Sequence, residues 1–301
     1  MADELLFESK NYYYLGNYQS AINEIHKKSK AINDKGGKQD ADYYLYKSYI
    51  SQGKYDLVQV EIKSDSTPTL QGLKLYASYL QSPQSNKDIT LVTIKEWIKD
   101  GIVQNNYHLQ VILASIYIHE QDYEEALKII HQADFIEGLA LLIQIYLKID
   151  RLDLAEKAYN VMKGIDIDAT PSLLSNAWIM IAQGDDKIKS ALMTLEELSE
   201  KYGGSPLLLN GQAVCCILLK RFEKAETLLL ESIEKNPNDF ETISNLVNCY
   251  INMKKPSEVV NVYLQQLKSS PQALKSVWLQ SVSLAEDNFE RSKSKYAASS
   301  V

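Results

Sequence analysis

Apolar residues recur along this chain at intervals of three and four, which is the spacing of amphipathic helices. In "LKSVWLQSVSLAEDNFERSKSKY", for example, Trp278, Val282, Ala285 and Phe289 form one apolar stripe. Strands would need runs of alternating β-branched residues, and strand signals of this kind are nearly absent. Twelve Gly and seven Pro are also few for 301 residues. The pattern predicts an all-α fold.

The helical pattern repeats with a period of 34 residues. "PLLLNGQAVCCILLKRFEKAETLLLES" at 206–232 aligns without a gap with "FETISNLVNCYINMKKPSEVVNVYLQQLKSSP" at 240–271. In this alignment Ala225 falls on Val259 and Leu229 on Tyr263, each pair 34 residues apart. A two-helix unit of this length is typical of the tetratricopeptide repeat. We therefore predict a tetratricopeptide-repeat-like α-solenoid.

A small residue one turn into the second helix marks each unit, because it lets the paired helices approach closely. Between Val58 and Ala126 the spacing is 68 residues, which is twice the period. This gap predicts a degenerate unit centred on Val92, with helices over 69–80 and 89–100. The markers are Ala21, Val58, Ala126, Ala155, Ala191, Ala225 and Val259.

The repeats account for almost the whole chain. About eight helix pairs span roughly residues 5–271, and we predict a single solenoid domain over residues 1–301. A further helix at about 273–296 carries the apolar stripe described above. We expect it to cap the stacking face that the last repeat would otherwise expose.

Charge and composition narrow the class of protein. The net charge of -7 argues against nucleic acid as a partner, because phosphate binding needs a surplus of Lys and Arg. The longest apolar run, "LALLI" at 139–143, is too short to span a bilayer, and the N-terminus has no apolar signal region. Three cysteines fit a reducing compartment. We expect a cytoplasmic protein that meets membranes only through a partner.

Candidate catalytic and metal-binding residues do not form a convincing set. Cys215, Cys216 and Cys249 lie among apolar residues of first helices, which favours core packing over metal binding. The four histidines show no zinc-ligand spacing. The most polar stretch, 26–42, is interpreted as a mobile loop between the first two units, with a partner contact as the alternative. We expect no catalytic residue, cofactor or metal.

The shape of a solenoid suggests where a partner would bind. Stacked helix pairs form a concave wall lined by the first helices, and residues 2, 5, 9 and 12 of each unit face it. These positions predict an apolar wall edged by Tyr, with few cations, that suits a helical or extended protein segment. Alternatively, some of these residues pack between repeats. The predicted partner-binding residues are Tyr13, Tyr43, Val111, Ile118, Leu147, Leu207, Val214 and Ile217.

Several segments go beyond the generic repeat and resemble the epsilon subunit family of coatomer. They are "LFESKNYYYLGNYQSAINE", "ASIYIHEQDYEEAL" with "KIDRLDLA", "PLLLNGQAVCCILLKRFEKAETLLLESI" and "KPSEVVNVYLQQLK". The resemblance runs nearly from end to end, and "LLLNGQA" is its most specific part.

The resemblance implies a structural subunit of the COPI vesicle coat, without catalytic residues, that acts in Golgi and retrograde Golgi-to-endoplasmic-reticulum transport. It further implies that the curved array binds and stabilises the C-terminal domain of the alpha coat subunit, and through it meets other coat subunits. The implied location is the cytosolic face of Golgi membranes and COPI vesicles. The alternative is a repeat-type adaptor or co-chaperone that binds a helical or extended segment of another protein.

Overall fold

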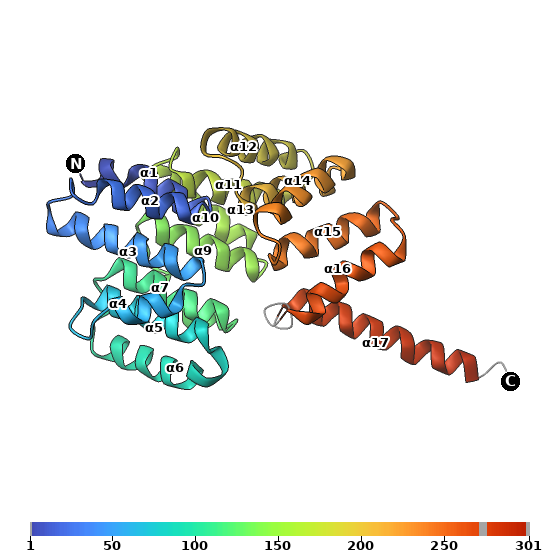
Figure 1. Cartoon of the computed structure of the whole chain (residues 1–301), viewed down its shortest axis with the longest axis horizontal. Helices are drawn as coiled ribbons and strands as arrows, with labels where there is room; N and C mark the ends of the chain where they lie inside the picture. Colours follow the sequence, from blue (N-terminus) through green and yellow to red (C-terminus); the bar gives the residue numbers. More distant parts are fainter. Residues whose placement is uncertain (1, 271–275, 299–301) are drawn as a thin grey trace. The chain divides into compact units, whose positions relative to one another are not determined.

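The computed structural model describes residues 2–270 and 276–298, and every regular element in these ranges is an α-helix (Figure 1). An all-helical architecture is expected of a solenoid, because each helix buries one apolar stripe against the neighbouring helices. The all-helical prediction is confirmed. The helices fall into two compact units, Met1–Tyr202 and Gly203–Val301. The expectation of a single domain stays a prediction.

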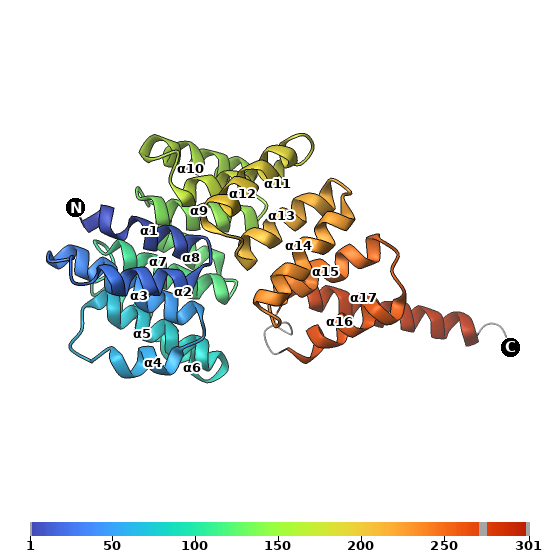
Figure 2. The same ribbon diagram turned by 45° about the horizontal axis from the view of Figure 1, so that its top comes forward.

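The first unit consists of six helix pairs, and the two members of each pair contact one another (Figure 2). The pairs are α1 (Ala2–Tyr14) and α2 (Tyr18–Lys28), α3 (Lys35–Ser51) and α4 (Tyr55–Glu61), α5 (Pro68–Gln81) and α6 (Pro83–Lys99), α7 (Tyr107–His119) and α8 (Tyr123–Ile130), α9 (Ile136–Lys148) and α10 (Leu152–Ile165), and α11 (Thr170–Gln183) and α12 (Lys187–Tyr202).

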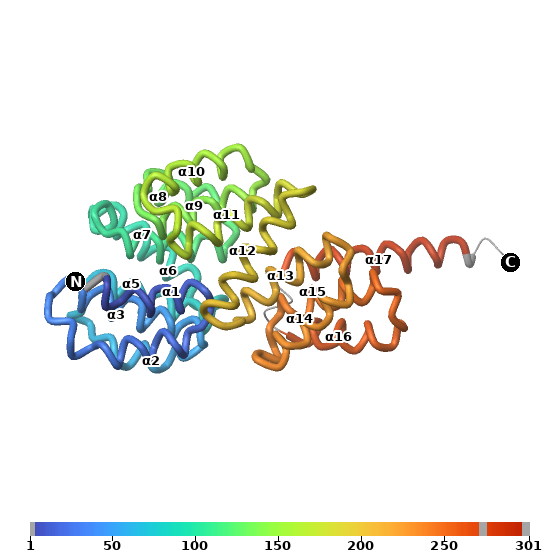
Figure 3. Tube along the Cα trace, turned by 90° about the horizontal axis from the view of Figure 1, so that it is seen from above, coloured from blue at the N-terminus to red at the C-terminus, as the bar shows by residue number. Residues whose placement is uncertain are grey.

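The second unit continues the repeat with two pairs and a longer terminal helix. They are α13 (Pro206–Leu218) and α14 (Phe222–Lys235), α15 (Phe240–Asn252) and α16 (Ser257–Ser269), and α17 (Val277–Ala298). Figure 3 follows the chain as a tube through these helices. The described residues therefore contain the eight predicted helix pairs and a terminal helix.

Six of the seven predicted markers are buried where the paired helices meet; the seventh was misplaced, because Val259 is 40% exposed and Val260 is buried instead. Ala21, Ala126, Ala155, Ala191 and Ala225 are all fully buried. A larger side chain at such a position would force the helices of a pair apart, because cores are closely packed. This steric limit explains why a small residue recurs at this position of the repeat and could be recognised in the sequence.

The degenerate unit is present as α5 and α6, but its centre was misplaced. Pro68 and Pro83 begin the two helices, where a missing backbone N–H does no harm. Val92 is exposed, however, whereas Thr90 and Ile94 on the same helix are buried. The prediction of a unit was right and the prediction of Val92 as its marker was wrong, because α6 turns a different side toward the core.

The polar stretch 26–42 is mostly helical. Helix α2 extends to Lys28 and α3 begins at Lys35, so only residues 29–34 lie outside helices. Asp34 caps α3, since its carboxylate accepts a 2.7 Å hydrogen bond from the backbone N–H of Gly37. The expectation of a long loop was wrong because an N-cap residue starts a helix that is polar in its first turns.

The terminal helix α17 does not bury its predicted stripe. Residues 273–275 lie outside the described residues. Trp278 and Val282 are half-buried, but Ala285 is exposed and Phe289 is 67% exposed. Leu279 is the residue that this helix buries. The prediction of a capping helix holds for its position, and the prediction that the whole stripe covers the last repeat is wrong. Across the described ranges, we find no helix with the length and apolar character that crossing a membrane requires.

Candidate functional site

Polar and aromatic residues from four first helices of the first unit lie together. They come from α1, α3, α7 and α9, and in the repeat frame they occupy positions 2, 5, 9 and 12, which face the predicted concave wall. We call this group the inner cluster. Its members are Lys10, Tyr13, Asp40, Tyr43, Lys47, His108 and Glu137.

Glu137 on α9 connects to α3 through two side chains. The Tyr43 hydroxyl donates to its carboxylate oxygens at 3.1 and 3.2 Å, and Lys47 forms an ion pair with the same carboxylate. The Lys47 ammonium also donates to the Tyr43 hydroxyl at 2.8 Å. Both charged side chains of this pair are largely buried. Mutual hydrogen bonding is what makes a buried ion pair tolerable.

His108 on α7 joins the same group from the fourth repeat. Its ring stacks on Tyr43 with centroids 3.8 Å apart, and its Nε2 lies 3.0 Å from a carboxylate oxygen of Asp40. The Lys10 ammonium of α1 lies 3.4 Å from the other Asp40 oxygen. Burial alone would raise the pKa of Asp40, but the hydrogen bond from His108 and the charge of Lys10 outweigh it and lower that pKa.

Four tyrosines form the aromatic part of this region. Tyr13, Tyr14, Tyr43 and Tyr44 meet at ring-centroid distances from 5.0 to 5.9 Å, mostly edge to face. The hydroxyls of Tyr14 and Tyr44 share a 2.6 Å hydrogen bond. Burial, and then the charge of Glu137 or of neighbouring tyrosines, raises the pKa of all four well above the ordinary value. These four tyrosines are therefore uncharged at neutral pH, and their rings and hydroxyls pack and hydrogen-bond within the fold.

The predicted wall residues of the first unit are less accessible than the sequence suggested. Tyr43 is 0% exposed and Val111 is 3% exposed. Tyr13, Ile118 and Leu147 are half-buried and lie against the hydrophobic core. The expected tyrosines and the few expected cations, Lys10 and Lys47, do lie on this wall, but it is less apolar than predicted because Asp40, His108 and Glu137 also meet there.

Asp40, His108 and Glu137 were missed by the sequence reasoning. Each occupies position 2 of its unit in the frame that identified Tyr43, Val111 and Leu147. The signal was therefore available, since three titratable residues at one repeat position line one wall. The prediction overlooked this signal because it selected mainly apolar residues from these repeat positions.

The second unit presents a more apolar wall. Leu207, Val214 and Ile217 of α13 are half-buried. Two further residues lie at the same ends of contacting helices: Leu218 of α13 is 48% exposed, and Ile251 of α15 is 58% exposed. Ile251 occupies position 12 of its unit, as Ile217 does. We call these five residues the apolar wall of the second unit.

Asn210, at position 5 of the same unit, points into the interior and fixes three helices. Its side-chain amide donates to the Thr242 hydroxyl at 2.7 Å and to the backbone carbonyl of Pro206 at 2.8 Å. Its carbonyl oxygen accepts from Asn245 at 3.0 Å, and Ser232 of α14 lies 2.9 Å from Thr242. A buried and satisfied network of this kind sets the angle at which α13, α14 and α15 meet.

The three cysteines lie in the core. Cys215, Cys216 and Cys249 are buried and free of disulfides. Burial raises the pKa of the Cys249 thiol to about 11, which keeps it protonated and unreactive at neutral pH. Among the described residues, no group of His, Cys, Asp and Glu is arranged to hold a metal ion.

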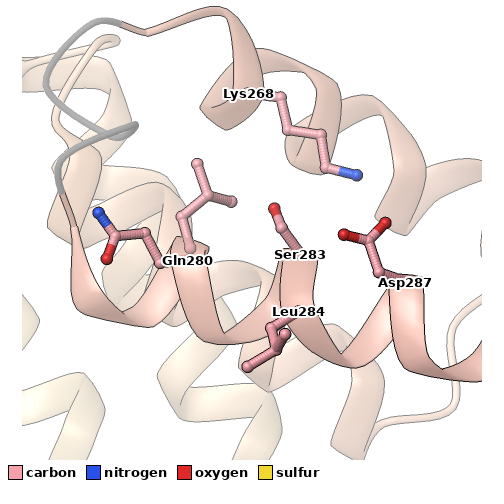
Figure 4. Close-up of a pocket in the computed structure, with 6 residues that line it drawn as sticks. Lys268, Gln280, Ser283, Leu284 and Asp287 are labelled. Atoms are coloured by element: carbon pink, nitrogen blue, oxygen red, sulfur yellow. The ribbon is translucent and has the colours of Figure 1, made fainter.

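A pocket of about 360 Å³ lies between α16 and α17 (Figure 4). The pocket is lined by Lys268 of α16 and by Leu279, Gln280, Ser283, Leu284 and Asp287 of α17. Lys268 forms a 2.7 Å ion pair with Glu286 at its edge. None of the predicted partner-binding residues lines this pocket.

Comparisons with known proteins give one consistent family. A family model described as the coatomer epsilon subunit matches residues 1–297. The chain is 60% identical to coatomer subunit epsilon of Dictyostelium discoideum, over 98% of this chain and 100% of that protein. It is 41% identical to coatomer subunit epsilon-1 of Arabidopsis thaliana, over 97% of each. It is 32% identical to coatomer subunit epsilon of Caenorhabditis elegans, over 89% of this chain and 90% of that one.

Solved structures agree on the fold. A structure of the APC/C hetero-tetramer Cut9–Hcn1 is similar with a TM-score of 0.61 at 11% identity, covering 90% of this chain and 54% of that one. A tetratricopeptide repeat protein from Parabacteroides merdae gives a TM-score of 0.50 at 11% identity, covering 93% and 97%. At such identities the likeness concerns the fold alone, and the prediction of a tetratricopeptide-repeat-like solenoid is confirmed.

Proposed function

Because this chain belongs to the coatomer epsilon subunit family, a structural component of the COPI coat rather than an enzyme, we propose that it binds and stabilises the C-terminal domain of the alpha coat subunit. The first helices of the repeats provide the binding surface. Through this partner the chain meets the other coat subunits and the cytosolic face of Golgi membranes and COPI vesicles.

The observation that carries the proposal is the apolar wall of the second unit. Leu218 and Ile251 are large apolar side chains that remain exposed near the C-terminal ends of α13 and α15, two first helices in contact, and Val214 and Ile217 of α13 are half-buried. Clustered apolar side chains on a solenoid wall are what a helical or extended protein segment buries on binding.

The inner cluster supports a protein partner over an acidic peptide tail. Lys10 and Lys47, the cations of this wall, already lie against Asp40 and Glu137. A receptor for acidic tails would need cations that are available for a carboxylate. An adaptor for acidic tails therefore gains no support from the charges of this unit.

Ile251→Asp tests the proposed surface most cleanly. A buried charge in an interface opposes binding, whereas the exposed position should tolerate it in the isolated chain. We expect affinity for the purified alpha C-terminal domain, measured by calorimetry, to fall by at least about tenfold, which corresponds to about 1.4 kcal/mol. The melting temperature of the isolated chain should stay unchanged.

Val262→Asp is the matched control, because Val262 is also exposed but lies on the second helix α16. It should bind like the unmodified chain. Equal losses from both variants, or no loss from either, would reject this wall as the binding surface. Saturating partner should also raise the melting temperature of the unmodified chain, since a ligand that binds only the folded state stabilises it.

A further inference from the structure

Helix α1 makes contacts that a simple solenoid would not make. In a solenoid each repeat contacts only its neighbours, so the curvature can vary. In the first unit, however, α1 of the first repeat contacts α11 of the sixth repeat. The same helix also reaches Tyr202, the last residue of α12. These contacts close the first unit into one turn.

Four side chains form this closure, which we call the clasp: Asn11, Tyr12, Thr170 and Tyr202. The buried Asn11 carbonyl oxygen accepts from the Thr170 hydroxyl at 2.8 Å, and its amide donates to the Tyr202 hydroxyl at 3.3 Å. The rings of Tyr12 and Tyr202 meet edge to face at 6.2 Å. In addition, Asn17 donates from its side chain to the Tyr202 backbone carbonyl at 3.2 Å.

The closed turn agrees with the limited access to the predicted wall. Tyr43 and Val111 are buried, and Glu137 of α9 contacts Tyr43 and Lys47 of α3 although these helices are three repeats apart. While the clasp is shut, the side chains on the wall of the first unit contact one another instead of a partner. A partner segment reaches Tyr43 and Val111 only when α1 and α3 separate from α9 and α11.

We propose that the clasp is a gate, which opens to admit the partner to the first unit and shuts again around it. This inference rests on the proposed function. The contacts that would part suit a gate, because they are polar or aromatic: the hydrogen bonds and ring edge of the clasp, and the contacts of Tyr43 and Lys47 with Glu137. Such groups exchange protein partners for water at a small net cost, whereas an interdigitated apolar contact would not.

A reversible disulfide tests the gate. The side chains of Asn11 and Thr170 meet in a 2.8 Å hydrogen bond, so cysteines at these two positions would face one another across the clasp. The double variant Asn11→Cys, Thr170→Cys can therefore be locked by oxidation and released by reductant. The association rate with the alpha C-terminal domain is measured for both forms of the full chain by stopped flow. Binding that requires a conformational change is slow, so the oxidised form should associate at least about tenfold more slowly than the reduced form.

The control is a disulfide between neighbouring repeats. Thr69 and Asn106 lie in the same unit, with side chains 3.1 Å apart, so Thr69→Cys, Asn106→Cys leaves the clasp untouched. Its oxidised and reduced forms should associate equally fast. Tyr202→Ala, which removes the ring and hydroxyl of the clasp, should associate several-fold faster than the unmodified chain.

Equal association rates for the locked and released clasp, with the partner bound in both cases, would overturn the gate and leave the proposed function intact. A rate for Tyr202→Ala no greater than that of the unmodified chain would do the same. An unmodified chain that fails to bind the alpha domain would instead reject the proposed function, and the gate with it.

Discussion

Asn210 shows what one residue contributes to this molecule. It lies in the segment "LLLNGQA", and its amide joins α13, α14 and α15 through Thr242, Asn245 and Ser232. When one member of a buried network is lost, several other groups lose hydrogen bonds. Removing that member therefore destabilises the protein more than the loss of a single hydrogen bond would. Asn210, at the centre of this segment, thus meets a structural requirement of the fold.

We predict that Asn210→Ala lowers the free energy of unfolding by about 2 to 4 kcal/mol, because Asn245 loses its acceptor and Thr242 loses one of its hydrogen bonds beside a new cavity. Urea unfolding followed by circular dichroism measures the change. Asn248→Ala is the control, since Asn248 is exposed on the neighbouring helix and should change stability by less than about 0.5 kcal/mol. Similar losses for both variants would show that the network contributes nothing special.

At the scale of the element, the turn between paired helices is a repeated C-terminal cap. After α13, the N–H of Lys220 donates to the carbonyl of Ile217 at 2.9 Å and that of Arg221 to Cys216 at 2.8 Å. This is a Schellman motif, which requires a left-handed residue, usually Gly. Gly16 and Gly53 meet the requirement, but Lys220 adopts a φ of 58° without being glycine.

We predict that Lys220→Gly stabilises the chain by about 0.5 to 1 kcal/mol, because it removes the steric cost of a side chain at positive φ. The midpoint of urea unfolding should move to a higher concentration. Lys220→Ala keeps the β-carbon and removes the rest of the side chain, so it serves as the control and should not stabilise. If Ala stabilised as much as Gly, the gain would come from losing the lysine and not from the backbone.

At the scale of the whole molecule, the buried tyrosines limit stability at high pH. Burial raises the pKa of Tyr13, Tyr14, Tyr43 and Tyr44 in the folded chain well above the ordinary tyrosine value of about 10. The unfolded chain therefore releases these protons first. Their contribution to stability is complete below pH 10 and is lost as the pH rises through and above that value.

We accordingly expect alkaline unfolding to be coupled to tyrosine ionisation. In a titration upward from neutral pH, exposed tyrosines should ionise first, and a final portion of the tyrosinate absorbance should appear together with the loss of helical circular dichroism. Replacing Tyr14 and Tyr44 together by Phe should shrink that final portion. Complete ionisation before any loss of helix would contradict the burial of these rings.

How much the sequence revealed can be judged from individual elements. The small markers such as Ala126 and Ala225 are buried where helices meet, and the doubled gap after Val58 correctly indicated a further unit. The marker within that unit could not be placed, because the repeat period fixes spacing but not which side of α6 turns inward. The prediction that α17 buries its whole apolar stripe was wrong for a related reason. Amphipathic spacing shows which side of a helix is apolar, but it does not show whether a neighbouring helix covers that side.

The sequence by itself determined the helical class, the repeat period, the family and the burial of the cysteines, because each depends on local periodicity or on residue chemistry. Only the tertiary structure decided that Asp40, His108 and Glu137 meet across repeats, that Tyr43 and Val111 are covered, and that α1 contacts α11. Each of these depends on the curvature of the array. Curvature is the sum of small rotations between successive helix pairs, and no single repeat encodes that sum.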